Sequence, residues 1–211
     1  MLCPASTRRQ VVLSVAALAA LVSPGWALAQ VTVGQPAPAF SLMAADGKTV
    51  VLESLRGKTV VLEWTNHDCP FVRKHYDAGN MQAQQKEAAA AGVVWLQVIS
   101  SAPGKQGYVD GATAGALNTK RQAAPAATLL DSTGKVGKQY GAKTTPHMYV
   151  ISTQGTLVYQ GGIDSIASAR ADDIAKAEQH VRVALAEVAK GNPVTKATSK
   201  PYGCSVKYAD S

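Results

Sequence analysis

The feature that most constrains the fold is an apolar run that leads into a cysteine and a proline. The run from Thr59 to Thr65 is mostly apolar, which predicts a central strand covered on both faces. A helical pattern begins at Pro70, and the first position of a helix accepts proline because its N–H would have no partner there. The sequence therefore predicts that Cys69 lies where a buried strand turns into a helix.

This position favours a reactive thiol at Cys69. Free N–H groups and the helix dipole at a helix N-terminus favour the thiolate over the thiol. We expect Arg73, Lys74 and His75 to add positive charge around the sulfur. Asp68 opposes that effect. The alternative is a buried structural cysteine, and position and charge alone leave both open.

The segments after Cys69 predict a strand, helix and strand unit. An alanine- and glutamine-rich helix is expected from Met81 to Ala91, with Gly92 at its C-terminal end, followed by a buried strand from Val93 to Ile99. Connections of this kind join parallel strands and are right-handed almost without exception. We expect this strand to pair in parallel with the run that precedes Cys69.

The remaining segments predict two hairpins and a long helix. Asp46-Gly47 is the turn of an N-terminal hairpin whose second arm is Thr49 to Leu52. The strands His147 to Ile151 and Thr156 to Tyr159 are expected to pair in antiparallel fashion. Apolar residues at helical spacing predict one amphipathic helix from Asp172 to Lys190.

The N-terminal segment has the pattern of an export signal. Arg8-Arg9 form a basic region, Val11 to Val22 an apolar region too short to span a bilayer, and Ala27-Leu28-Ala29 a cleavage site. We expect cleavage near Ala29 and export, to the periplasm in a bacterium. The route, general or twin-arginine, stays open.

Length and charge exclude several classes of protein. We expect a signal peptide over 1–29, one domain over 30–192 and a C-terminal tail over 193–211, with no membrane span in the mature protein. The formal net charge is +7, but the lysines are scattered and no basic run is interleaved with aromatic residues. Nucleic acid is therefore not an expected partner.

Cysteine usage limits the chemistry further. Cys3 leaves with the signal, so Cys69 and Cys204 remain in the mature chain. An oxidising compartment permits a disulfide between them. The path of the tail is not determined by its spacing, so Cys204 is either a functional partner of Cys69 or an inert buried thiol.

The order of elements, with a Thr145-Pro146 step before a late strand, resembles the thioredoxin-like superfamily and its redoxin branch of the AhpC/TSA type. The stretch Gly34 to Phe40 and the turn Asp46-Gly47-Lys48 resemble the N-terminal hairpin of that branch. The stretch Gly203 to Tyr208 resembles a subgroup called peroxiredoxin-like. The resemblance covers Val33 to Ser165. It implies an α/β thioredoxin-like fold, with a central mixed sheet flanked by helices, an N-terminal β-hairpin extension and a C-terminal tail.

The resemblance also shows where this chain departs from its relatives. Cys69 matches the first cysteine of the thioredoxin C-x-x-C motif, but Val72 takes the place of the second. In the peroxiredoxin motif, Leu62 and Asn66 take the places of the proline and the threonine or serine. A mixed disulfide on Cys69 would therefore need another resolving thiol, and Cys204 is the remaining candidate.

Other site residues are implied by the same resemblance. Pro146 matches a cis-proline that lies against the active cysteine, so Thr145, Pro146 and His147 are expected at the substrate-binding site. Glu63 matches a buried acid that assists proton transfer, and burial would raise its pKa toward the range of a useful base. A solvent-facing Glu63 is the alternative.

We therefore expect an exported thiol oxidoreductase or antioxidant-type protein. Its nucleophile is Cys69, its substrate is a protein or small-molecule thiol or disulfide, and an external electron donor is required. No cofactor and no metal are expected.

Two rival functions stay open. One is copper handling through His67, Cys69 and His147, or Cys204, as soft ligands. The other is a binding module that has lost its chemistry, for which Val72 is the best argument. His75 and His180 lack a partner pattern and are expected at the surface or at its boundary.

Overall fold

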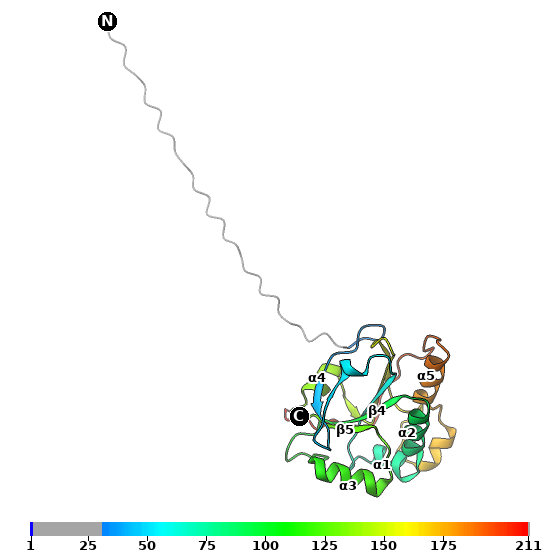
Figure 1. Cartoon of the computed structure of the whole chain (residues 1–211). Coiled ribbons are helices and arrows are strands. Elements are labelled where there is room, and N and C mark those ends of the chain that lie inside the picture. Colours follow the sequence, from blue (N-terminus) through cyan, green and yellow to red (C-terminus); the bar gives the residue numbers. More distant parts are fainter. Residues whose placement is uncertain (2–30, 211) are drawn as a thin grey trace.

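A computed structural model describes Met1 and residues 31–210 of the chain (Figure 1). Apart from Met1, the expected signal peptide and its cleavage site near Ala29 lie outside the described residues.

A five-stranded mixed sheet forms the centre of the molecule. Its strand order is β5-β4-β3-β7-β8. The strand β3 pairs in parallel with β4, as predicted, and antiparallel with β7. The predicted hairpin between β7 and β8 is also present. The strands are β3 (Val60–Trp64), β4 (Val94–Ile99), β5 (Ala127–Leu130), β7 (His147–Ile151) and β8 (Leu157–Gly161).

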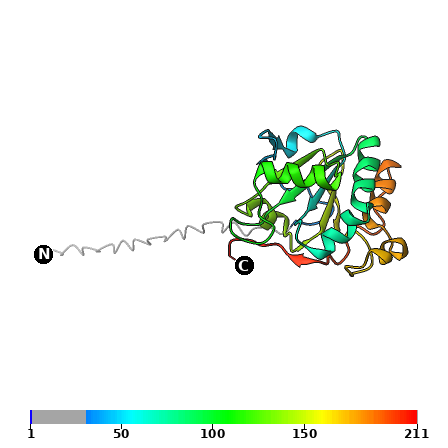
Figure 2. The same ribbon diagram turned by 90° about the horizontal axis from the view of Figure 1, so that it is seen from below.

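The two faces of the sheet are covered by different elements. One face packs against α1 (Pro70–Asp77), α2 (Asn80–Ala90) and α5 (His180–Ala189), and its core includes Val61, Cys69 and Trp95. The other face includes Leu62 and Trp64. It packs against α4 (Lys135–Tyr140), the hairpin β1 (Ser41–Met43) with β2 (Thr49–Val51), and the short 3₁₀ helix η1 (Leu52–Leu55). Figure 2 shows α2 and α5 side by side, and the C-terminal end of α3 (Gly111–Arg121) meets α2, where Gln82 donates to the carbonyl oxygen of Arg121 at 2.7 Å. Residues of β3 thus alternate between two cores, as a central strand requires.

The predicted helix from Asp172 to Lys190 is wrong in its first half. The segment instead forms the 3₁₀ helix η2 (Ala171–Lys176), and α5 begins only at His180. Ala177 has extended backbone angles, and both backbone groups of Glu178 bond to Ser165. These bonds replace the helical ladder, so the helix cannot continue through this point.

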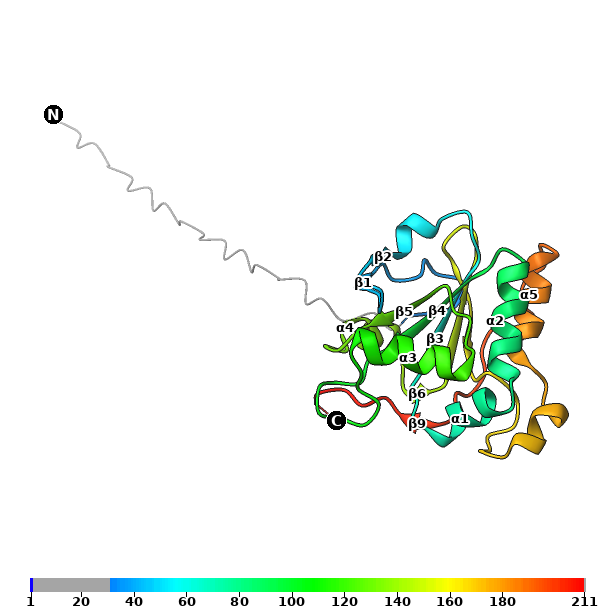
Figure 3. The ribbon, with the colours of Figure 1, turned by 60° about the horizontal axis from the view of Figure 1, so that its bottom comes forward.

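The C-terminal tail returns to the sheet. Residues Cys204–Ser205 form β9, which pairs antiparallel with β6 (Thr144–Thr145), and Thr145 stands opposite Cys204. Figure 3 shows this red segment running beside β6 and the start of α1. The tail thereby reaches the turn that carries Cys69.

This architecture confirms the predicted thioredoxin-like fold, a mixed sheet flanked by helices with an N-terminal hairpin. Within residues 31–210, no helix is both long and apolar enough to cross a membrane.

Candidate functional site

Cys69 occupies the turn predicted for it. It is the N-cap residue of α1, directly before Pro70, and its side chain is fully buried with an exposed fraction of 0%. As a thiol it donates a hydrogen bond to the carbonyl oxygen of Thr145 at 3.0 Å. The bond between Thr145 and Pro146 is cis, and this contact places it beside the sulfur.

The tail brings Cys204 to the same point. The backbone N–H of Cys204 donates to Sγ of Cys69 at 3.4 Å. The hydroxyl of Thr145 donates to the carbonyl oxygen of Cys204 at 3.5 Å, which adds to the pairing of β6 with β9. Both cysteines are free thiols. The tail, whose path could not be predicted from the sequence, therefore passes directly over Cys69.

The two thiols differ in acidity. Burial is the largest influence on Cys69 and opposes its ionisation. Hydrogen bonds from the side chain and N–H of Cys204, from the side chain of Thr145 and from the N–H of Val72 outweigh burial, so the pKa of Cys69 lies below its ordinary value of 9.0. Burial, followed by the hydrogen bond with Cys69 and its charge, raises the pKa of Cys204 to about 11. Cys69 is therefore the thiol that ionises first.

The expected charge support from α1 is wrong. Lys74 is buried and pairs with Asp164 at 3.4 Å, while Arg73 lies at the surface near Asp77 at 3.8 Å. His75 is also buried, and burial lowers its pKa to about 4. The charge of Asp164 opposes this shift and the charge of Lys74 adds to it, so His75 is neutral at pH 7. The acidity of Cys69 comes from aimed hydrogen-bond donors rather than from the basic residues of the helix.

Glu63 is buried, which excludes the solvent-facing alternative. Its carboxylate accepts hydrogen bonds from the Tyr76 hydroxyl and the Trp95 indole, each at 2.8 Å, and from the Gln85 amide at 3.2 Å. Desolvation outweighs these donors and raises the pKa of Glu63 above 4.5. Tyr76 lies seven residues after Cys69 in α1, about 10 Å along the helix axis. Glu63 thus contacts the helix that carries Cys69, at some distance from the sulfur.

The structure does not bring His147 together with Cys69. Its Nδ1 accepts from the N–H of Lys143 at 3.3 Å and interacts with the Tyr149 hydroxyl at 3.1 Å. Tyr149 belongs to the core on the other face of the sheet from Cys69. Burial lowers the pKa of His147 to about 4, with a smaller contribution from Lys143.

Of the proposed copper ligands, Cys69 and Cys204 lie together, whereas His147 is held by other groups. His67 lies beside Asp68 at 3.3 Å rather than beside a second soft ligand. In the described part of the chain, no group of three or more His, Cys, Asp or Glu side chains could hold a metal ion.

A buried polar cluster holds the tail just before Cys204, and no pattern in the sequence predicts it. The Tyr202 hydroxyl donates to Asp164, and Asp164 also pairs with Lys74. His75 lies 3.3 Å from the Tyr202 hydroxyl through Nε2. The expectation that His75 and His180 lie at the surface is wrong, since both are at most 5% exposed.

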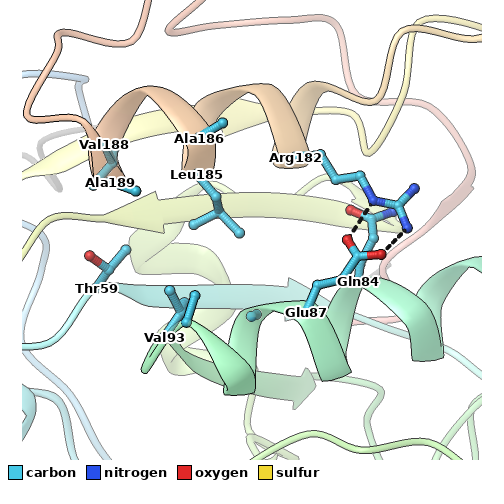
Figure 4. A pocket seen from close by; sticks show the side chains of 11 residues that line it. Thr59, Gln84, Glu87, Val93, Arg182, Leu185, Ala186, Val188 and Ala189 are labelled. Carbon is cyan, nitrogen blue, oxygen red and sulfur yellow. Dashed lines mark hydrogen bonds and ion pairs between the residues drawn. The ribbon is translucent and has the colours of Figure 1, made fainter.

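A separate groove lies between α2 and α5. It has a volume of about 340 Å³ and an apolar wall that includes Val93 and Leu185, with the Arg182–Glu87 ion pair beside it (Figure 4). Thr59, at the beginning of β3, lines this groove. Cys69 follows the other end of β3, so the groove is not part of the thiol site.

Comparisons with known proteins agree with this geometry. A model described as the AhpC/TSA family matches residues 33–160. A conserved protein from Geobacillus kaustophilus superposes with a TM-score of 0.72 at 24% identity, over 87% of this chain and 95% of the other. A protein from Sinorhizobium meliloti gives a TM-score of 0.72 at 22% identity, over 86% and 97% of the two chains. No curated protein matches the chain.

Proposed function

Because the chain belongs to the AhpC/TSA family, we propose that it is a thiol–disulfide oxidoreductase in which Cys69 is the nucleophile and Cys204 the resolving thiol. The observation that carries this proposal is the contact between the N–H of Cys204 and Sγ of Cys69 at 3.4 Å. Cys204 thereby stands in for the second cysteine that Val72 replaces in the C-x-x-C position.

The first step is attack of the Cys69 thiolate on a substrate disulfide. One substrate sulfur forms a mixed disulfide with Cys69, and the other leaves as a thiolate. The lowered pKa of Cys69 supplies the thiolate for this step. The substrate must reach a sulfur that the tail covers, so the tail must move before attack.

The second step is attack of Cys204 on Sγ of Cys69. A Cys69–Cys204 disulfide forms, the second substrate thiol leaves, and the proton of Cys204 passes to that thiol. The hydrogen bond and the charge of Cys69, which raise the pKa of Cys204, are both lost once Cys69 is in a mixed disulfide. Cys204 thus becomes more acidic when its thiolate is needed. Two electrons pass to the substrate, and an external thiol donor must return them.

Disulfide exchange is favoured over peroxide reduction by the residues around the turn. Asn66, in the position of the peroxiredoxin threonine or serine, has its side-chain oxygen bonded to the N–H of Asp68 at 2.9 Å. Leu62, in the position of the proline, packs in the core on the far face of the sheet. The amide nitrogen of Asn66 donates to the carbonyl oxygen of Gln106 at 3.4 Å, and Leu62 has no donor, so the hydroxyl that the family motif provides for a peroxide is missing.

The remaining site residues receive supporting roles in the proposal. Thr145 and Pro146 border the sulfur and would contact the substrate. Glu63, whose pKa is raised by burial, would accept or return a proton during exchange. We give no role at the sulfur to His147, because its ring is held by Lys143 and Tyr149. We propose that the protein works outside the cytoplasm, in keeping with its N-terminal pattern.

Mass spectrometry and a disulfide-reduction assay test the proposal. The oxidised protein should contain a linked Cys69–Cys204 peptide. Cys69→Ser should abolish reduction of a model protein disulfide, whereas Cys204→Ser should accumulate a mixed disulfide on Cys69. A stable sulfenic acid on Cys69 with free Cys204 would exclude Cys204 as the resolving thiol. Absence of reduction by the unaltered protein would favour a binding module.

A further inference from the structure

A short segment of the tail, residues 202–208, crosses the turn that carries Cys69, and we call it the strap. Its central residue for the site is Cys204, whose backbone pairs with Thr145. Cys69 beneath it has no exposed surface. A reagent or substrate larger than a few atoms can therefore reach Sγ of Cys69 only when the strap lifts.

The strap is held at its first residue by a buried charge. The Tyr202 hydroxyl donates to Oδ1 of Asp164, which also accepts from the N–H of Ile166 at 3.1 Å. The Tyr202 ring contacts Phe71 edge-on, with ring centroids 5.9 Å apart. Burial, followed by the hydrogen bond and charge of Asp164, raises the pKa of Tyr202, so its hydroxyl keeps the proton that it donates.

Two residues of α1 fix the orientation of Asp164. Lys74 donates to Oδ2 of Asp164 at 3.4 Å and to the carbonyl oxygen of Ile166 at 3.3 Å, and neither charged side chain is exposed. His75 accepts from the Asn80 amide through Nδ1 at 2.8 Å, so its Nε2 carries the proton and points toward the Tyr202 hydroxyl at 3.3 Å. Donors thus run in one direction, from His75 to Tyr202 to Asp164.

The far end of the strap is held mainly through backbone carbonyl groups. The N–H of Val206 donates to the carbonyl oxygen of Lys143 at 3.1 Å, and the Tyr208 hydroxyl donates to that of Ala142 at 2.8 Å. The Lys138 ammonium also lies 5.7 Å from the centroid of the Tyr208 ring. The hydrogen bond from Tyr202 to the Asp164 carboxylate is stronger than these two bonds to neutral carbonyl oxygens.

Gly203 lets the strap lie flat on Thr145. A Cβ at this position would lie 2.0 Å from the carbonyl oxygen of Thr145, and the φ angle of +135° is one that residues with side chains rarely adopt. Because Cys204 is only two residues from Tyr202, holding Tyr202 in place limits how far Cys204 can move from Thr145.

We infer that Asp164 is a positioning residue that holds the Tyr202 hydroxyl, and thereby keeps Cys204 against Cys69 and Cys69 covered. The inference deepens the proposed function, because it names the group that determines how often the active thiol opens to a substrate. Lys74 serves the cluster by neutralising Asp164, which would otherwise be a buried unpaired charge.

The test measures how fast Cys69 of the reduced protein reacts with a maleimide that carries a polyethylene glycol chain. Tyr202→Phe keeps the ring and removes only the hydroxyl. We expect it to raise the labelling rate of the Cys69 peptide about tenfold to hundredfold, the factor for losing a hydrogen bond to an ionised group. Asp164→Asn should act in the same direction. Rates taken across the pH range in which Cys69 ionises separate a change in access from a change in acidity.

Tyr140→Phe is the matched control. It also removes a buried tyrosine hydroxyl, here one that donates to the carbonyl oxygen of Pro38 at 2.7 Å, away from the strap. Urea unfolding of each variant shows whether global stability is lost to a similar extent. Equal labelling rates for Tyr202→Phe and Tyr140→Phe at matched stability would overturn the inference.

The outcome is independent of the disulfide itself. If the unaltered protein formed no Cys69–Cys204 disulfide while Tyr202→Phe still exposed Cys69, that result would support the positioning role of Asp164 and exclude the resolving role of Cys204. If the disulfide formed normally and the labelling rate did not change in Tyr202→Phe or Asp164→Asn, the positioning role of Asp164 would be excluded and the proposed function would be retained.

Discussion

Two carboxylates are buried on the same side of the sheet, Glu63 in β3 and Asp164 beside the strap, and their hydrogen-bond partners differ. Glu63 accepts hydrogen bonds from the neutral groups of Tyr76, Trp95 and Gln85, and Arg121 acts on it through its charge, with a smaller effect than desolvation. Asp164 meets a buried cation, Lys74, as well as the hydroxyl of Tyr202. Neutral donors leave Glu63 with a raised pKa, since desolvation outweighs them.

The difference separates a carboxyl that can take part in proton transfer from one that pairs with a cation. A buried carboxyl with a raised pKa holds its proton to a higher pH than an exposed one, as a proton-transfer group requires. Removing either partner of a buried ion pair leaves the other charge uncompensated. Glu63 therefore suits proton transfer, and Asp164 suits a fixed anchor.

Removing Asp164 should give the largest effect on stability. Asp164→Ala leaves Lys74 buried without a charged partner, which costs about 3–5 kcal/mol of unfolding free energy. Urea denaturation measures it, with Asp77→Ala as a control, because the exposed pair of Asp77 with Arg73 should contribute about 1 kcal/mol or less. Equal losses of unfolding free energy in the two variants would mean that the buried pair of Asp164 with Lys74 contributes no more to stability than the exposed pair.

The Asp164 cluster should also weaken in acid, through His75. The pKa of His75 is about 4 in the folded protein and about 6.5 in an unfolded chain. The unfolded state therefore binds the proton first, so this contribution to stability is present above pH 6.5 and is lost as the pH falls toward 4. The loss is about 3 kcal/mol. Stability measured against pH should fall less steeply in His75→Gln, and an unchanged slope would contradict a neutral buried His75.

Glu63 should give a smaller effect of opposite sign. Its folded pKa is raised above 4.5, so the folded state keeps a proton that the unfolded chain has lost. Its contribution to stability is present below pH 4.5 and is lost as the pH rises through the folded pKa. Glu63→Gln should flatten this part of the stability curve, because glutamine has no proton to lose. The same variant should slow disulfide reduction by about a hundredfold. Unchanged turnover with a flattened curve would leave Glu63 a purely structural group.

The smallest effect is expected for Arg73, whose charge does not point at the sulfur of Cys69. Arg73→Ala should leave the apparent pKa of Cys69 unchanged, since Arg73 lies at the surface near Asp77. Cys204→Ser should change that pKa, because the Cys204 side chain contributes a hydrogen bond to Cys69. Alkylation rates against pH measure both. If the pKa of Cys69 rose in Arg73→Ala, the basic residues of α1 would after all stabilise the Cys69 thiolate, as first expected.

Local patterns were sufficient to predict most of the fold. The apolar run of β3, the Pro70 start of α1, the parallel β3–β4 pair and the β7–β8 hairpin all follow from short-range rules, and the family match supports them. The cis bond before Pro146 came from resemblance rather than from propensity. The helix expected from Asp172 was wrong because a distant residue, Ser165, takes the backbone groups of Glu178.

The site was less predictable because it depends on contacts between distant segments. Lys74 and His75 look like surface residues of a basic helix, and only Asp164, some 90 positions later, explains their burial. Nothing near Asp164 in the sequence signals a partner. Cys204 could be named as a candidate by elimination, but its contact with Cys69 depends on the path of the whole tail.

The long separation between the two cysteines has a consequence for synthesis. The contact from Cys204 to Cys69 spans 135 positions of the chain. A ribosome adds about 5–20 residues per second, so Cys69 emerges on the order of 10 s before Cys204 exists. During that interval Sγ of Cys69 has neither its cover nor the thiol that we propose as its partner. In the nascent chain, Cys69 is therefore most exposed to pairing with the wrong thiol before the last few residues are made. A product truncated before Cys204 would keep Cys69 uncovered permanently.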